Sequence, residues 1–243
     1  MSQLYRAPIA RLAIPLMIVF SILFSLARGF GMNGPGYLRP ILPLSFIIMM
    51  ALPWVLLGPE GRRRCGLRGS EKKSHYLSAL LFGGLAAFLC GVFGYALFGI
   101  GTNNWYVTIA NSYRGMVDTS GFSLLQLHLM FTLPAIFFSP LGEEIFFRGV
   151  LQTTLEEKMS DSLSTAIECV FFGLIHLFHH GLTYSGGQFS LLPLSGALWV
   201  LLMAGVAFLF AYLRKRSGSI LPAIAGHAAF NLCMNTFIFA VLW

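Results

Sequence analysis

Long apolar stretches separated by short polar connections dominate this sequence. Seven of them reach or approach the roughly 20 mostly apolar residues that a bilayer-spanning helix needs: 9–27, 41–57, 77–101, 123–155, 165–180, 194–213 and 220–242. The fourth is too long for one straight span, and Pro134 and Pro140 interrupt it, so we expect it to be kinked or split. The pattern predicts an all-α polytopic membrane helical bundle with seven or eight transmembrane helices.

Composition and charge support this class. Apolar residues make up 56% of the 243 positions and charged residues only 10%, whereas soluble domains carry roughly 25% charged residues. We therefore interpret residues 1–243 as a single integral-membrane domain in contact with the lipid bilayer. The net charge of +7 would also suit nucleic-acid binding. However, the positive side chains cluster at the ends of the apolar stretches, so we expect no nucleic-acid partner.

The Lys and Arg residues also predict an orientation. Two strongly basic connections, 58–76 and 214–219, contain Arg62, Arg63, Arg64, Arg68, Lys72, Lys73, Arg214, Lys215 and Arg216. A seven-span parity puts Arg6 and Lys158 on the same side and leaves the other side with Arg28, Arg39 and Arg114. Because cytoplasmic loops carry the excess of Lys and Arg, we expect a multi-pass protein whose N-terminus is cytoplasmic.

Two adjacent carboxylates, Glu143 and Glu144, interrupt the fourth apolar stretch. Ionisable groups at membrane depth are costly, and they are usually paired and functional. Glu144 and Arg148 are four residues apart, which predicts an ion pair on one helix face. Glu143 points about 100° away around the helix and is left for another role. A further carboxylate, Glu168, lies about one turn from a helix end, and we expect it to be solvated.

Candidate partners lie in two later apolar stretches. His176 ends the run Phe172 to His176, and His227 and Asn231 are again four residues apart. At about 1.5 Å per residue, these groups and Glu143 fall at a similar depth in the bilayer. We expect them to converge. Two further histidines, His179 and His180, follow at the end of this helix, and we expect them to be interfacial.

These residue types suit hydrolysis without a serine or cysteine nucleophile. A carboxylate with an imidazole can take a proton from water. A second imidazole and an amide can donate hydrogen bonds to the oxyanion of a tetrahedral intermediate. The same Glu and His side chains could instead hold zinc, and the residue types do not separate the two mechanisms.

With these groups in place, the chain resembles the CAAX-protease and bacteriocin-processing (CPBP, or Abi) family of intramembrane endopeptidases. The signature of that family is Glu-Glu-x-x-x-Arg, Phe-x-x-x-His and His-x-x-x-Asn, each on a membrane helix. Residues 143–148, 172–176 and 227–231 match the three motifs in order and spacing. The resemblance covers about residues 130–240 and places the catalytic helices in about 123–242.

The resemblance implies a role for each matching residue. Glu143 would be the water-activating carboxylate and His176 its assistant, with His227 and Asn231 as the oxyanion site and Glu144 and Arg148 as supporting residues. It favours a metal-free, glutamate-type mechanism, so we expect no cofactor. In the zinc alternative, Glu143, His176 and His227 would be the metal ligands. The implied substrate is a membrane-embedded or lipid-anchored protein or peptide, for example a CaaX-like, leader-peptide or C-terminal sorting-signal substrate.

Two other classes of function compete with this hypothesis. A non-enzymatic membrane immunity or binding protein would use the polar cluster to hold a peptide. A proton-coupled transporter would use Glu143 and Glu144 as proton carriers, but such proteins usually contain repeats, and the sequence has none that we can detect. The sequence predicts neither the substrate nor the oligomeric state.

Overall fold

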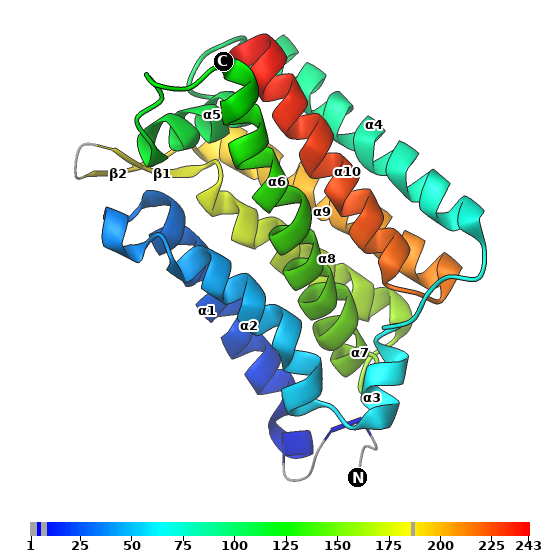
Figure 1. Cartoon of the computed structure of the whole chain (residues 1–243). Helices are drawn as coiled ribbons and strands as arrows, with labels where there is room; N and C mark the ends of the chain where they lie inside the picture. Colours follow the sequence, from blue (N-terminus) through cyan, green and yellow to red (C-terminus); the bar gives the residue numbers. More distant parts are fainter. Residues whose placement is uncertain (1–3, 6–8, 186–187) are drawn as a thin grey trace.

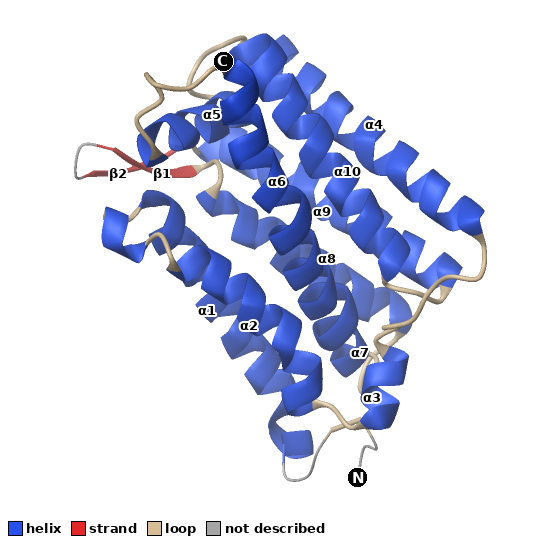
Figure 2. Cartoon of the chain, in the orientation of Figure 1, coloured by secondary structure: helices blue, strands red, loops and turns tan. Residues whose placement is uncertain are grey.

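The computed structural model describes residues 4–5, 9–185 and 188–243 and is 79% helical and 3% strand. Seven helices are long and apolar enough to cross a membrane. The predicted all-α membrane bundle is therefore confirmed, with seven spans over the described residues (Figures 1 and 2).

The spanning elements in chain order are α1 (Ala13–Asn33), α2 (Ile41–Leu56), α4 (Lys73–Phe98), α6 (Leu124–Glu143) continued by η3 (Glu144–Leu151) and α7 (Gln152–Leu155), α8 (Asp161–Ile175) continued by η4 (His176–Phe178), α9 (Pro193–Ser217), and α10 (Leu221–Phe237) continued by η5 (Ile238–Leu242). Shorter elements connect them: η1 (Ile9–Leu12), η2 (Gly36–Leu38), α3 (Pro59–Arg64), α5 (Trp105–Met116) and the hairpin β1 (Leu182–Ser185) and β2 (Gln188–Leu191). The hairpin is antiparallel, with Leu182 opposite Leu191.

Polar residues in the sequence define where several helices begin. Ser123 and Gln126 form a reciprocal capping box at the start of α6, and Ser160 caps α8 by accepting from the backbone of Leu163. Each cap satisfies a backbone N–H that would otherwise lack a partner at the first turn. These caps fix the ends of the two helices that carry Glu143 and His176.

The helices pack as two groups around two apolar clusters. One cluster joins α1, α2, η3 and α8, and the other joins α4, α5, α9 and α10. In Figure 1, α1 and α2 lie along one flank and α4 along the other, with α6, α8, α9 and α10 between them. At the α4–α10 contact a side chain on Gly83 would lie 1.9 Å from the carbonyl oxygen of Gly226, so this close approach needs glycine.

Of the two expectations for the fourth span, a kinked or a split helix, the split is wrong. Pro134 and Pro140 both lie inside α6, and the helix continues through them. The change of geometry comes later, in the π-helical segment η3, which begins at Glu144. Segments with this wider winding inside helices are frequent at functional sites. One long span of 32 residues results, from Leu124 to Leu155.

The first span also differs from its expected boundary. The apolar pattern predicted an end at position 27, but α1 continues to Asn33. Arg28 therefore lies within the helix and is 2% exposed, so placing it in an outer connection was wrong. The expected connection 102–122 likewise contains a helix, α5, whose Trp105 and Tyr106 are fully buried.

Candidate active site

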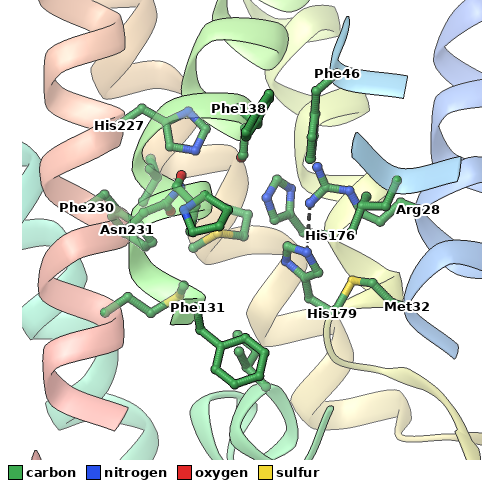
Figure 3. Close-up of a pocket in the computed structure, with 18 of the residues that line it drawn as sticks. Arg28, Met32, Phe46, Phe131, Phe138, His176, His179, His227, Phe230 and Asn231 are labelled. Carbon is green, nitrogen blue, oxygen red and sulfur yellow. Dashed lines mark hydrogen bonds between the residues drawn. The ribbon is translucent and has the colours of Figure 1, made fainter. Parts of the chain in front are cut away.

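A cavity of about 280 Å³ lies between the helices and is bordered by all three signature-bearing spans. Most of its wall is apolar, from α1, α2, α5, α6, α9 and α10. Its polar lining comes from Arg28, Tyr113, Ser139, His176, His179, His227 and Asn231. In Figure 3, Arg28, His176 and His179 lie on one side, and His227 and Asn231 face them from α10. A mostly apolar cavity with a few converging polar groups is typical of a binding or active site.

Glu143 lies directly behind this wall and is completely buried. Its Oε1 atom forms an ion pair with Arg28 and accepts a hydrogen bond from Ser139 Oγ at 2.9 Å. Its Oε2 atom has no hydrogen-bond partner among the described residues. Because a buried carboxylate oxygen without a partner is costly, this atom is a candidate for binding a water or a substrate group.

His176 lies near that free oxygen. Its Nδ1 lies 2.7 Å from the carbonyl oxygen of Phe172. A carbonyl only accepts, so Nδ1 carries the proton and the lone pair of neutral His176 is on Nε2. Nε2 lies 4.0 Å from Glu143 Oε2. This distance is too long for a direct hydrogen bond, but one water molecule can contact both atoms.

Glu144 belongs to a separate buried network. Its Oε1 lies 2.8 Å from His227 Nδ1 and 3.1 Å from Arg148 Nη1. The second contact is the ion pair that the four-residue spacing predicted. Arg148 Nε also lies 3.5 Å from Glu168 Oε1. Glu168 is fully buried, so the expectation that it is solvated was wrong: an arginine from another span covers it.

His227 and Asn231 both line the cavity, as their shared helix face predicted. Asn231 donates one amide N–H to the carbonyl oxygen of Ala135 at 2.9 Å, and its second N–H is available for another acceptor. The His227 ring stacks on Phe210 with centroids 5.1 Å apart. The structure thus brings these two residues to the cavity that His176 also borders.

Two residues of this cluster were missed or misplaced from the sequence. Arg28 pairs with Glu143, and its Nη1 donates to His179 Nε2 at 2.8 Å. His179 therefore lines the cavity. Burial, with the Arg28 guanidinium adding to it, lowers the pKa of His179 well below its usual range. The sequence signal for Arg28 was a single cation within a run of apolar and small residues up to Met32.

His180 is buried inside the protein. Its ring nitrogens lie 2.9 Å from the hydroxyls of Thr108 and Ser195, which tie α5 and α9 together beside the cavity. Burial lowers its pKa to about 4. His180 is thus a neutral structural histidine that joins α5 to α9.

The predicted zinc ligands do not form a compact site. Among the described residues, no three His, Cys, Asp or Glu side chains are arranged to hold a metal ion. The Arg28 guanidinium occupies Glu143 Oε1, and Glu144 occupies His227 Nδ1. A cation next to the carboxylate also repels a divalent metal.

Comparison with known proteins gives one match. Residues 125–233 match the family model described as Rce1-like, type II CAAX prenyl endopeptidase. The segment contains all three motifs, so the family resemblance predicted from them is confirmed. The match indicates an intramembrane endopeptidase. No curated protein and no solved structure gives a significant match.

Proposed function

We propose, from the match of residues 125–233 to the Rce1-like endopeptidase family, that this chain hydrolyses a peptide bond in a membrane-embedded or lipid-anchored protein. Glu143 and His176 would activate the water. The observation that supports this most strongly is the 4.0 Å gap between Glu143 Oε2 and His176 Nε2 beside the cavity. The site binds one water in that gap and the substrate segment in the apolar cavity.

The first chemical step transfers one proton. The water oxygen attacks the scissile carbonyl carbon while Glu143 Oε2 takes a proton from the water. His176 Nε2 accepts a hydrogen bond from the water's other O–H, because its Nδ1 proton is donated to the carbonyl oxygen of Phe172. This orients the oxygen lone pair toward the substrate. When the C–N bond breaks, Glu143 returns the proton to the leaving amine and becomes a carboxylate again.

The second pair of residues stabilises the oxyanion. Asn231 donates its free amide N–H to the carbonyl oxygen as that oxygen gains charge. His227 Nδ1 already donates to Glu144, so His227 must carry both protons to donate from Nε2 as well. Arg148 in turn holds Glu144, which is a supporting role.

We also propose that this hydrolysis needs no metal. Supporting this, the Arg28 guanidinium lies against Glu143, and a cation next to the carboxylate repels a divalent metal. Purified protein should cleave at the same rate before and after treatment with a zinc chelator. Stoichiometric zinc whose removal abolishes cleavage would contradict this part of the proposal.

The orientation that we favour has a cytoplasmic N-terminus. At the end of the bundle where α1 begins lie Arg11, Arg62, Arg63, Arg64, Arg68, Lys72, Lys73, Lys158, Arg214, Lys215 and Arg216; Arg6 is outside the described residues. The opposite end has Arg39 and Arg114. The cavity extends toward that second end, where α5 supplies Tyr113 and Met116. By the positive-inside rule, this second end is extracytoplasmic.

The test compares protein termini in membranes from cells that express the wild type or Glu143→Gln at equal levels. The wild type should generate new termini in a small set of membrane proteins, and the variant should not. Glu60→Gln, an exposed carboxylate on α3, is the matched control and should behave as the wild type. Identical termini with Glu143→Gln and wild type would overturn the proposal and favour a binding protein.

A further inference from the structure

We infer that Arg28, from a span outside the matched segment, is a positioning residue that holds Glu143 ionised with Oε2 turned toward His176. The inference rests on the proposed function. Arg28 lies in α1, whereas the match to the family covers residues 125–233. Its side chain is 3% exposed and lines the cavity. The first span thus contributes a side chain to the candidate active site.

The guanidinium of Arg28 contacts two acceptors at once. Nη2 pairs with Glu143 Oε1, and Nη1 donates to His179 Nε2. An arginine has rigid, forked donors, so fixing one arm on His179 fixes the other arm on Glu143. The dashed line in Figure 3 marks the arm to His179. Arg28 therefore connects α1, α6 and the residue that follows η4 through one planar group.

This contact decides which oxygen of Glu143 is free. Arg28 and Ser139 both occupy Oε1, which leaves Oε2 without a partner and 4.0 Å from His176 Nε2. Without Arg28, only the Ser139 hydroxyl would hold the carboxylate, and either oxygen could accept that bond. The orientation of the catalytic oxygen would then be lost in part.

The same contact supplies the counter-charge that a base needs at this depth. A buried carboxylate without a cation takes up a proton. The titratable groups that face Glu143 are Arg28 from α1, His176 and His179 from the end of α8 and η4, and His227 from α10. Arg28 is the permanent cation of this set. Arg148 is committed to Glu144 and Glu168.

The experiment measures kcat/KM against pH with a peptide reporter taken from the cleaved proteins. Arg28→Gln should lower the rate about 100-fold at neutral pH, which is the scale of a general-base contribution. The acidic limb of its pH–rate profile should move to higher pH, so the loss of rate relative to the wild type should shrink as the pH rises. Arg63→Gln, which breaks an exposed ion pair on α3, should match the wild type.

Arg28→Lys separates charge from geometry. It keeps a cation, so the acid limb should stay in place, while the rate should fall about tenfold because a lysine cannot bridge both acceptors. A wild-type rate in Arg28→Lys overturns the forked contact. A wild-type profile in Arg28→Gln, or an equal loss at every pH, overturns the positioning role.

The two proposals fail separately. Normal cleavage by Glu143→Gln would reject the hydrolytic role of Glu143 and this inference with it. Loss of cleavage in Glu143→Gln together with a wild-type profile in Arg28→Gln would reject only the role of Arg28. If Arg28→Gln does not accumulate as folded protein, the rate and profile of Arg28→Lys decide the inference alone.

Discussion

Glu143 and Glu144 are adjacent in sequence and equally buried, yet they occupy different environments. Oε1 of Glu144 contacts both Arg148 and His227 within one closed network. Glu143 contacts Arg28 and Ser139 with one oxygen and presents the other toward His176. Both carboxylates have an Oε2 without a hydrogen bond. Oε2 of Glu143 lies 4.0 Å from His176 Nε2, whereas Glu144 contacts its histidine, His227, through Oε1.

The difference shows how one motif can supply both a reactive group and its support. The wider winding of η3 begins between the two carboxylates, and the two side chains leave the helix on different sides. Each meets its own arginine, one from α1 and one from the same helix. The identity of the neighbouring helix, more than the residue type, therefore separates a candidate base from a structural carboxylate.

The largest expected effect is on the Glu143 side. His176→Ala removes the group that orients the water, so cleavage should fall by about 10²–10⁴-fold while the melting temperature in detergent changes little. The control is His75→Ala, which replaces a histidine in the first turn of α4. A His176→Ala enzyme with normal turnover would place the water elsewhere.

On the Glu144 side the main loss should be in stability. Arg148→Met leaves two buried carboxylates, Glu144 and Glu168, without their cation. Breaking a buried pair in this way costs about 3–5 kcal/mol. The melting temperature should drop sharply, whereas Arg63→Met at an exposed pair should cost at most about 1 kcal/mol. Equal melting temperatures for both variants would reject a structural role for this network.

A smaller effect on turnover is expected at the oxyanion position. Asn231→Ala removes one donor and should lower kcat by about 10²–10³-fold. Because the donor acts mainly in the transition state, KM should change little. Asn111→Ala, at an exposed pair with Arg114, is the control. A rise in KM with unchanged kcat would instead indicate that Asn231 binds the substrate in its ground state.

The smallest expected effect concerns pH and stability. Burial lowers the pKa of His180 to about 4, below its value of about 6.5 in the unfolded chain. Between these values the unfolded state binds more protons, so stability is complete above about pH 6.5 and falls as the pH drops toward 4. We expect a loss of about 1–3 kcal/mol over this range. His180→Gln should flatten the dependence of stability on pH. An unchanged slope in this variant would assign the pH dependence to another group.

Local spacing was enough to predict several parts of the site. The four-residue separation of Glu144 and Arg148 predicted their pairing, and the spacing of His227 and Asn231 predicted a shared face on the cavity. Hydropathy also predicted the membrane bundle, because long apolar helices leave few alternatives in a bilayer.

Contacts between distant helices could not be predicted in the same way. Arg28 was assigned to a loop because the apolar pattern weakens at Gly29, although α1 continues to Asn33. Glu168 looked solvated because its cover, Arg148, comes from another span. A linear pattern gives the depth of a residue but does not identify the helix packed against it.

The most direct test of the central claim compares Glu143→Gln with Glu144→Gln in proteoliposomes, using the same reporter and equal amounts of folded protein. We predict no detectable cleavage by Glu143→Gln and reduced but measurable cleavage by Glu144→Gln, since Glu144 acts through His227. Cleavage by Glu143→Gln at the wild-type rate, or a complete loss confined to Glu144→Gln, would contradict the account.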